Sequence, residues 1–352
     1  MTATVERVDP RTSPVWRELA AHGDLFTSPP WLSAVCDHYG FAARAAVLRD
    51  PDGVPAAGLA WVDVDDVRGR RRLALPFSDR GDPVVRPGLA DPAAAWAALA
   101  AAVTADLPGG TPFTLRCLDT SVAAGDPGLA TAGEAAWHVT PVTDPDTMHR
   151  RLRSAVRRNI ATAARHGLRV VLRDDLAAVA AYHRLHLRLR KDKYGLLAQP
   201  LSFFEQVWKQ FAAAGAVRVG LVDAGGPPVA GAVYLVWGDT VYYKFGASDP
   251  EHLSSRPNEA LHWACLRWAA GRGLSALDWG LSDLDQPGLV RFKRGWGTHE
   301  RRIRTLRPAG ADPVPRGPAD DLLADLTALL AGPDVPDHVT DSAGGLLYRY
   351  FC

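Results

Sequence analysis

The sequence predicts an α/β (α+β) fold built from two domains. Segments with the alternating or apolar pattern of strands are interleaved with segments of helical periodicity along the chain, which is typical of layered α/β structures. The chain has 352 residues, and at roughly 100–200 residues per domain this length suggests two domains. With 47% hydrophobic and 22% charged residues it can bury a substantial core, which excludes a mainly disordered protein.

The first half predicts helices that begin at proline or aspartate and strands with short apolar runs. Ser28 followed by two prolines is a helix start, and Arg68–Arg72 resembles a hairpin turn. The expected elements are helices over 14–21, 28–38 and 91–105, strands over 43–49, 58–64 and 113–118, and a small-residue loop over 121–133.

The second half opens with a predicted helix over 146–166, closed by Gly167 in a position that favours a left-handed cap. The clearest hairpin joins 229–237 to 240–246 through Gly238-Asp239. We expect further strands over 168–172, 217–222 and 276–280, helices over 176–190, 201–214, 257–272 and 318–330, and a loop over 281–289. Both halves share a helix-then-strands order, and we place the domain boundary between residues 1–147 and 148–352.

Composition also restricts the partners and the compartment. Forty basic against 39 acidic side chains give a formal charge of +1, so the chain does not coat nucleic acid through bulk charge, although a local basic patch is allowed. The first ten residues lack a secretory signal, and the Ala-rich stretch 93–105 is too short to span a bilayer. Four scattered cysteines suit a reducing compartment, so we expect a cytoplasmic protein with no membrane span.

Several catalytic motifs are absent from the sequence. There is no phosphate-binding P-loop, zinc-binding His-Glu-x-x-His helix, nucleophile elbow or dinucleotide fingerprint. His183 and His186 lie one helical turn apart, but a third ligand is not evident, so we predict no metal site and a partly exposed helix face instead.

The predicted helix over 146–166 begins an unusually basic segment. Between Asp146 and Asp174 there is no acidic residue, whereas Leu152, Val156 and Ile160 recur at helical spacing and can pack. Guanidinium groups without local acids favour an anionic partner, and phosphate fits their planar fork; a solvated helix face is the alternative. The arginines of this segment include Arg150, Arg151, Arg153, Arg157, Arg158, Arg165 and Arg169.

Two further segments contain candidate site residues. Along a strand Tyr242 and Lys244 would share one face and Tyr243 the other, which gives either a substrate wall or a core aromatic strand. Phe292 and Trp296 flank Lys293, so its ammonium would lie in a partly dry site where it can stabilise a developing oxyanion. A surface lysine is the alternative.

These segments form part of an ordered series that resembles the FemABX-like transferases, a duplicated branch of the GNAT acyltransferase fold. The match runs from about Arg150 to Gly297 and is weaker, but in register, in the first half. The residues that carry it are Arg157–Gly167, Pro200–Phe204, Tyr243–Ser248, Pro257–Ala264, Ala269–Gly273, Asp278–Gly280 and Arg291–Gly297, with Phe26–Trp31 and Leu75–Asp79 in the first half.

The resemblance implies two tandem GNAT-like domains with a cleft between them, and transfer of an activated acyl group onto an amine. By the same resemblance Lys293 lies at the reaction centre, and a tyrosine, Tyr242 or Tyr243, lies near the acceptor. We assign the catalytic role to Lys293 and Tyr243. The implied substrate-binding residues are Tyr242, Lys244, Phe292, Trp296, Arg188, Arg190, Lys191, Ser78 and Asp79, and those for tRNA or phosphate are Arg150, Arg151, Arg157, Arg158 and Arg165.

Two departures from the family pattern bear on the substrates. No lysine follows Trp31 to grip a diphosphate, which argues against a UDP-linked acceptor. No Gln/Arg-x-x-Gly-x-Gly/Ala turn is present to hold coenzyme A. We therefore expect an aminoacyl-tRNA donor, an amine of a small metabolite or cell-wall precursor as acceptor, and no bound cofactor. The alternatives are an acyl-CoA-dependent N-acyltransferase and a non-catalytic protein that binds an anionic ligand.

Overall fold

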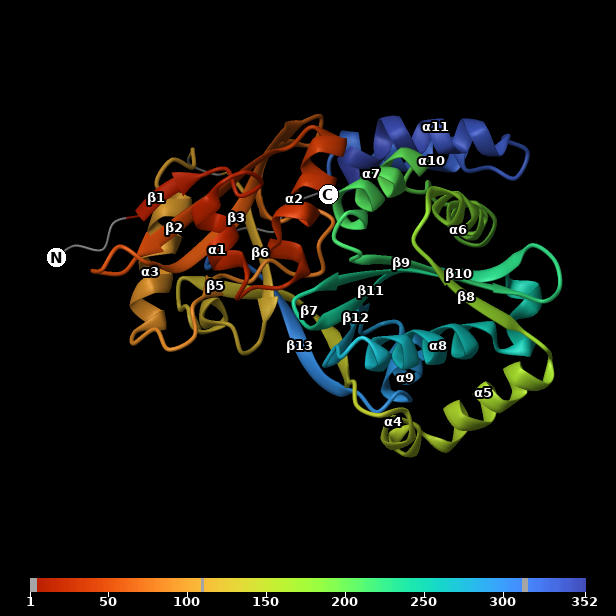
Figure 1. Cartoon of the computed structure of the whole chain (residues 1–352). Coiled ribbons are helices and arrows are strands. Elements are labelled where there is room, and N and C mark those ends of the chain that lie inside the picture. Colours follow the sequence, from red (N-terminus) through yellow and green to blue (C-terminus); the bar gives the residue numbers. More distant parts are fainter. Residues whose placement is uncertain (1–4, 109–110, 312–315) are drawn as a thin grey trace. The chain divides into compact units, whose positions relative to one another are not determined.

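The computed structural model describes residues 5–108, 111–311 and 316–352, and these form two compact units (Figure 1). Unit 1 contains the described residues up to Ala136 together with Arg301–Ala319 and Cys352. Unit 2 contains Trp137–Glu300 and Asp320–Phe351. Residues 301–319 thus join unit 1 although they follow unit 2 in the sequence, while the expected division after residue 147 stays a prediction.

Unit 1 combines a mixed sheet with α-helices. Its strands follow the order β1-β2-β3-β4-β6-β13, and β5 pairs with β3. Strands β4 and β6 are parallel and α3 connects them, whereas β2, β3 and β4 form an antiparallel meander. The elements are β1 (Val5–Val8), α1 (Pro14–Ala20), α2 (Pro29–Tyr39), β2 (Ala42–Arg49), β3 (Pro55–Asp66), β4 (Gly69–Ala74), β5 (Val84–Val85), α3 (Pro92–Thr104), β6 (Phe113–Leu118) and β13 (His299–Pro308).

Unit 2 is also a mixed sheet, with the order β7-β12-β11-β10-β9-β8, and β7 belongs to it from Trp137 onward. Figure 1 shows α8 on one face of this sheet and α6 on the other. The elements are β7 (Leu129–Pro141), α4 (Pro145–Arg151), α5 (Ser154–Arg165), β8 (Arg169–Arg173), α6 (Leu176–Arg188), α7 (Leu201–Ala212), β9 (Val217–Asp223), β10 (Pro228–Trp237), β11 (Thr240–Ser248), α8 (Pro257–Gly271), β12 (Ala276–Asp283), α9 (Pro287–Arg294), α10 (Pro318–Leu330) and α11 (Asp337–Leu347).

The two units repeat one order of elements. The repeat starts at β1 in unit 1 and at β8 in unit 2. In each, this first strand is followed by two helices and an antiparallel meander of three strands, and one helix then leads to a strand that is parallel to the last strand of the meander. The pairs β4–β6 and β11–β12 are both parallel, and the connections between their strands run through α3 and α8, respectively. The α/β class predicted from the sequence is therefore confirmed, and the topology agrees with duplication.

Helix starts follow the signals in the sequence. Ser28 is the N-cap of α2, with Pro29 at the first helical position, and Gly40 ends the helix in the left-handed region at φ 72°. Asp175 caps α6 in the same way by accepting the Ala178 N–H at 3.0 Å. Local chemistry therefore sets where these helices begin and end.

Four expectations need correction. Residues 121–133 are not only a loop, because β7 begins at Leu129. The basic helix over 146–166 is two helices, since Leu152 and Arg153 have extended ψ angles of 143° and 148°. The loop over 281–289 is too long, because β12 continues to Asp283 and α9 begins at Pro287. Strands β1 and β13 and helix α11 were not expected.

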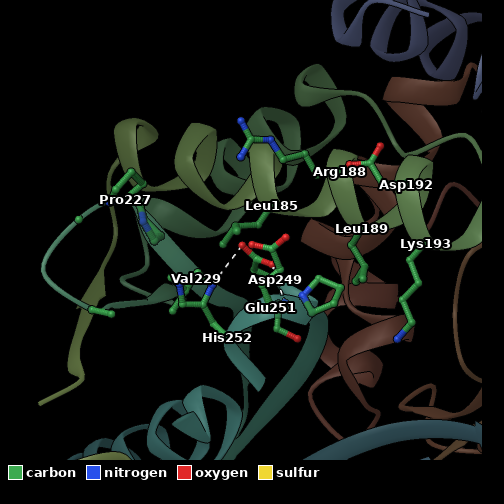
Figure 2. Close-up of a pocket in the computed structure, with 15 residues that line it drawn as sticks. Leu185, Arg188, Leu189, Asp192, Lys193, Pro227, Val229, Asp249, Glu251 and His252 are labelled. Carbon is green, nitrogen blue, oxygen red and sulfur yellow. Dashed lines mark hydrogen bonds and ion pairs between the residues drawn. The ribbon is translucent and has the colours of Figure 1, made fainter. Parts of the chain in front are cut away.

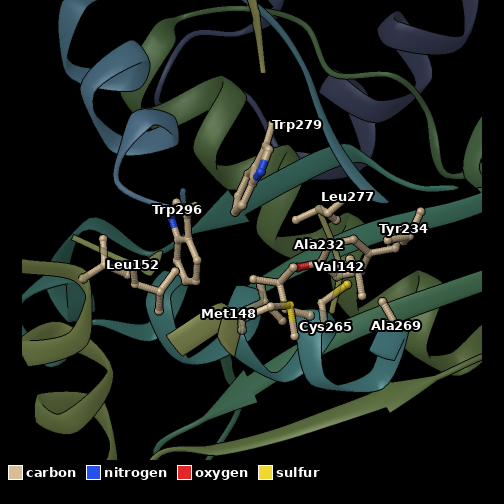
Figure 3. Packing of buried hydrophobic residues seen from close by; sticks show 14 of the residues in the cluster. Val142, Met148, Leu152, Ala232, Tyr234, Cys265, Ala269, Leu277, Trp279 and Trp296 are labelled. Atoms are coloured by element: carbon tan, nitrogen blue, oxygen red, sulfur yellow. The ribbon is translucent and has the colours of Figure 1, made fainter. Parts of the chain in front are cut away.

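Each unit has its own hydrophobic core. In unit 1, Leu99 of α3 and the strand residues Trp61 and Leu115 are fully buried in one core cluster. In unit 2, the core between the sheet and α8 includes the buried Trp279, Trp296 and Tyr234 (Figure 3). Every helix in the described ranges is too short or too polar to traverse a bilayer.

Candidate functional site

Lys293 lies inside unit 2. It belongs to α9 and only 2% of it is exposed. Its ammonium donates hydrogen bonds to the carbonyl oxygens of Gly280 at 3.1 Å and Leu281 at 2.9 Å. A buried ammonium interacts with nearby charge far more strongly than one in water. Its position is that of a group able to stabilise an anion.

The two carbonyls reach the same ammonium because β12 is distorted at Gly280. In a regular strand the chain alternates from residue to residue, so successive groups point in opposite directions. Gly280 instead adopts φ 67°, a left-handed conformation that glycine takes without steric cost. The chain turns there, and the carbonyls of Gly280 and Leu281 both face Lys293.

A buried carboxylate holds this turn. Asp278, 2% exposed, accepts the Gly280 N–H at 2.7 Å through Oδ1. The indole N–H of Trp137, on β7, lies 3.0 Å from Oδ1 and 2.9 Å from Oδ2 of the same carboxylate. Sequence reasoning used Asp278 only as part of a motif. A lone acidic residue inside an apolar strand segment was the available signal.

Aromatic rings surround this region on the α8 side of the sheet (Figure 3). The ring centres of Trp279 and Trp296 lie 5.3 Å apart, and the centre of the His262 imidazole lies 4.8 Å from that of Trp279 and 5.8 Å from that of Trp296. Phe292 joins the same cluster, 6.0 Å from Trp296. Thr140 Oγ1 accepts the Trp279 indole N–H at 2.8 Å and donates to the Trp296 carbonyl at 3.1 Å, so it links β12 to the end of α9.

His262 is a neutral imidazole in this cluster. It is 2% exposed, and Tyr234 Oη lies 2.9 Å from its Nδ1. Burial lowers the pKa of His262 to about 3, and the Lys293 charge adds to this effect. At neutral pH the ring therefore carries no charge and is too weak a base to take a proton from an ammonium.

Strands β11 and β12 separate beside the cluster. They pair only over 240–242 and 276–278, although both continue beyond these residues. A bulge at Lys244 shifts the pairing of β11 with β10, so that Tyr243 faces α8 and Phe245 packs on Phe204 of α7. The strict alternation expected at 242–244 is thus interrupted.

The three candidate residues expected along β11 take different positions. Tyr243 packs 4.7 Å from His262, and burial raises its pKa to about 12, so its hydroxyl stays protonated. Its hydroxyl lies over Gly246, where an added Cβ would be 1.8 Å away. Tyr242 is buried, and the Lys244 ammonium lies 5.5 Å from the Phe245 ring. Their roles at a substrate stay predictions.

The expected acceptor-binding cations lie around the end of α6. Arg188 lines a pocket of about 820 Å³ (Figure 2), but it extends away from the Asp249 and Glu251 carboxylates at the centre of that view. Arg190 donates to the Leu197 carbonyl at 3.0 Å. Lys191 is buried, and its ammonium contacts the Val335 carbonyl and Asp337, 3.0 Å away. Lys191 therefore fixes the start of α11.

Ser78 and Asp79 lie in unit 1, on a constrained loop. Ser78 is buried and its Oγ accepts the Trp31 indole N–H at 2.9 Å. Leu75 and Phe77 adopt left-handed φ values of 69° and 56°, which cost on the order of 1–2 kcal/mol each. Contact of this loop with a substrate stays a prediction.

The arginines of α4 and α5 form a basic surface, defined here as Arg150, Arg151, Arg153, Arg158 and Arg165, all exposed. Within the described ranges, Arg151, Arg153 and Arg158 have no side-chain hydrogen bond or ion pair. Arg150 and Arg165 bond only to neighbouring threonine hydroxyls. Arg157 differs, because its guanidinium donates to the Leu152 and Arg150 carbonyls and stabilises the break between the two helices.

The basic surface begins beside α9. The Arg153 N–H donates to the Gly295 carbonyl at 3.0 Å, two residues after Lys293. Gly295 lacks a side chain where a Cβ would meet Val156 of α5 at 2.7 Å. On its other side α5 is tied to α8, because Asn159 donates to the buried Glu259 at 2.8 Å. The exposed arginines and the buried Lys293 therefore belong to one packed substructure.

In the described part of the chain, no three His, Cys, Asp or Glu side chains are grouped so as to hold a metal ion. His183 lies 3.1 Å from Asp341, and His186 lies 2.9 Å from Gln199. Burial lowers the pKa of His186 to about 3. Both rings are buried, which corrects the expected partly exposed face.

Part of the chain matches proteins of known family. Residues 150–294 match the family model of an acetyltransferase (GNAT) domain, and this range contains both Lys293 and the basic surface. The lipid II:glycine glycyltransferase of Staphylococcus saprophyticus subsp. saprophyticus is 32% identical over 77 residues, which cover 20% of this chain and 19% of the relative. The enzyme of the same description from Staphylococcus epidermidis is 31% identical over 77 residues, covering 20% and 18%. The matched stretch spans about one fifth of these relatives.

Solved structures extend the likeness to the whole fold. FemX has a TM-score of 0.65 at 16% identity and covers 85% of this chain and 96% of its own. A protein of unknown function from Bacteroides thetaiotaomicron has a TM-score of 0.56 at 9% identity, covering 87% and 99%. The resemblance to FemABX-like transferases predicted from the motifs is confirmed by the sequence matches together with the fold of FemX.

Proposed function

We propose that this chain is an acyltransferase that moves an aminoacyl group from aminoacyl-tRNA to an amine of a small metabolite or cell-wall precursor and forms an amide. The observation that carries the proposal is the Lys293 ammonium, buried at the place where β11 and β12 separate and bound by two backbone carbonyls. The acetyltransferase domain match and the glycyltransferase relatives support an acyl-transfer reaction.

The reaction needs little acid–base chemistry from the protein. The acceptor amine attacks the ester carbonyl, a C–N bond forms, and the C–O bond to the ribose hydroxyl breaks. Lys293 stabilises the oxyanion that develops on the carbonyl oxygen. The proton lost by the amine ends on the departing ribose oxygen, and Tyr243, whose hydroxyl stays protonated, is the relay. Positioning an amine against an activated ester supplies much of the remaining rate acceleration.

Two features support RNA as the donor. The basic surface carries exposed guanidinium groups that match phosphate. Its Arg153 contacts Gly295, which follows Lys293 by two residues in the sequence, through a backbone hydrogen bond. The N-terminus of α8, which follows β11, is a poor pyrophosphate site. Pro257 removes an N–H there, and the preceding turn carries the two carboxylates of Asp249 and Glu251, which repel an anion, against the one guanidinium of the N-cap Arg256.

A second candidate is an acyl-CoA-dependent N-acyltransferase. The observation in its favour is the description of the matching family, which is an acetyltransferase domain. The two candidates share the role of Lys293 and differ in the donor alone.

The test measures transfer of a labelled amino acid from charged tRNA to amine acceptors, including lipid II, and compares it with transfer from labelled acyl-CoA. Lys293→Ala should lower kcat with the preferred donor by about 100- to 1,000-fold. Lys209→Ala, which removes an exposed lysine of α7, should leave the rate unchanged. Full activity in Lys293→Ala would refute the mechanism, and transfer from acyl-CoA alone would replace the donor.

A further inference from the structure

We propose that Asp278 is the positioning residue for Lys293. Its carboxylate fixes the turn at Gly280, and this turn directs two carbonyl oxygens onto the Lys293 ammonium. The inference rests on the proposed function, because it concerns the group that stabilises the oxyanion in that reaction.

The first step concerns the free-energy cost of burying the Asp278 carboxylate. Asp278 is 2% exposed and lies in a strand between the core residues Leu277 and Trp279. A buried charge costs several kcal/mol unless hydrogen bonds compensate it. The N–H groups of Trp137 and Gly280 provide this compensation at 2.7–3.0 Å. Burial of a carboxylate at this position lowers the stability that an apolar residue would give, so packing alone does not explain an aspartate here.

The second step is what the carboxylate holds. Oδ1 accepts the N–H of the residue two positions later, the local bond by which aspartate stabilises a turn. Gly280 then takes its left-handed conformation within a strand that continues to Asp283. Without this bond the strand would regain regular alternation, and only one of the two carbonyls could face Lys293.

The third step concerns the partners of α9. Thr140 donates to the Trp296 carbonyl and the Arg153 N–H donates to the Gly295 carbonyl, so the backbone that follows Lys293 is held by contacts that do not involve Asp278. The flexible part is the four-carbon stem of Lys293, which the Gly280 and Leu281 carbonyls hold at its end. Asp278 therefore acts on the position of the ammonium more than on the stability of α9.

The experiment compares Asp278→Ala with Asp278→Asn under the transfer assay. Asn keeps an Oδ1 that accepts from Gly280 and Trp137 but removes the charge. We expect Asp278→Ala to lower kcat by about 100-fold with KM within about threefold, because an ammonium displaced by about 1 Å loses that much. Asp278→Asn should recover kcat to within about fivefold of the wild type. A kcat in Asp278→Ala equal to the wild type, or no rescue by Asn, would overturn the inference.

A double variant separates this inference from the proposed function. If Asp278 acts through Lys293, Asp278→Ala/Lys293→Ala should be no slower than Lys293→Ala alone. Additive losses would refute the positioning role while leaving the role of Lys293 intact. An active Lys293→Ala would instead refute the proposed mechanism itself.

Glycine variants keep the inference testable if Asp278→Ala does not fold. Gly280→Ala strains the same turn from the backbone side and should lower kcat in the same way. The matched control is Gly238→Ala, which imposes the same strain at φ 59° in the β10–β11 turn with open space around it. Equal activity of both glycine variants would count against the inference.

Discussion

His262 should make the stability of this protein fall in mild acid. The ring is buried, Tyr234 lies at hydrogen-bond distance, and burial next to Lys293 lowers its pKa to about 3. In the unfolded chain a histidine has a pKa of about 6.5. Between these values the unfolded state binds a proton that the folded state excludes, so the free energy of unfolding decreases as the pH falls.

The magnitude follows from the two pKa values. Lowering the pH from 7.5 to 5.0 stabilises the unfolded state through this one group by about 2 kcal/mol, at 1.36 kcal/mol per pH unit below 6.5. Carboxylates with lowered pKa values, such as Asp106 and Glu300, add little in this window because they protonate at lower pH. His186, whose pKa is also about 3, contributes a similar amount.

The assay is urea unfolding at pH 7.5 and 5.0 for the wild type, His262→Gln and His22→Gln. The glutamine oxygen can still accept from Tyr234, but the side chain does not titrate. His262→Gln should lose about 2 kcal/mol less than the wild type between the two pH values. His22 is exposed, so its variant should follow the wild type. Identical pH dependence in His262→Gln and the wild type would show that the imidazole is not excluded from protonation by the fold.

Two further predictions concern Tyr243 and the basic surface. In Gly246→Ala the new Cβ meets the Tyr243 hydroxyl, so transfer activity should drop at least tenfold and the free energy of unfolding by about 1–3 kcal/mol. Gly226→Ala, which has open space around the new Cβ, is the control. Transfer at the wild-type rate in Gly246→Ala would contradict the placement of Tyr243. Arg151→Ser/Arg158→Ser should reduce the slope of log affinity for tRNA against log salt by about 1.5, at 0.7–0.9 per phosphate contact. An unchanged slope, as expected for Lys209→Ser, would place the RNA elsewhere.

The elements predicted well are those whose signals are local. The β10–β11 hairpin follows from Gly238-Asp239 between two apolar runs, and α3 and α10 follow from their proline starts. Strand β13 was missed because its arginine-rich sequence gives no apolar alternation, and its pairing partner β6 is far away in the chain. Strand β7 was missed because its first residues are small and fit a loop equally well.

The candidate site likewise has features that local sequence predicts and features that depend on distant contacts. Lys293 could be singled out from its aromatic neighbours in the sequence, and its burial agrees with that interpretation. The contact of Trp137 with Asp278 joins residues 141 positions apart, and no pattern in either segment indicates it. The bulge at Lys244 and the turn at Gly280 depend on neighbouring strands, so alternation read from sequence alone failed there.

The position of β13 bears on how the protein is made. Its residues 303–306 pair with 115–118 of β6, so the sheet of unit 1 has an open edge until roughly 180 further residues have left the ribosome. At a synthesis rate of about 5–20 residues per second, this edge of β6 stays unpaired for on the order of 10–40 seconds. During that time β6 offers free backbone groups to any other strand, a hazard for self-association. A nascent chain of this protein should therefore depend on cellular holding factors until nearly its last strand emerges.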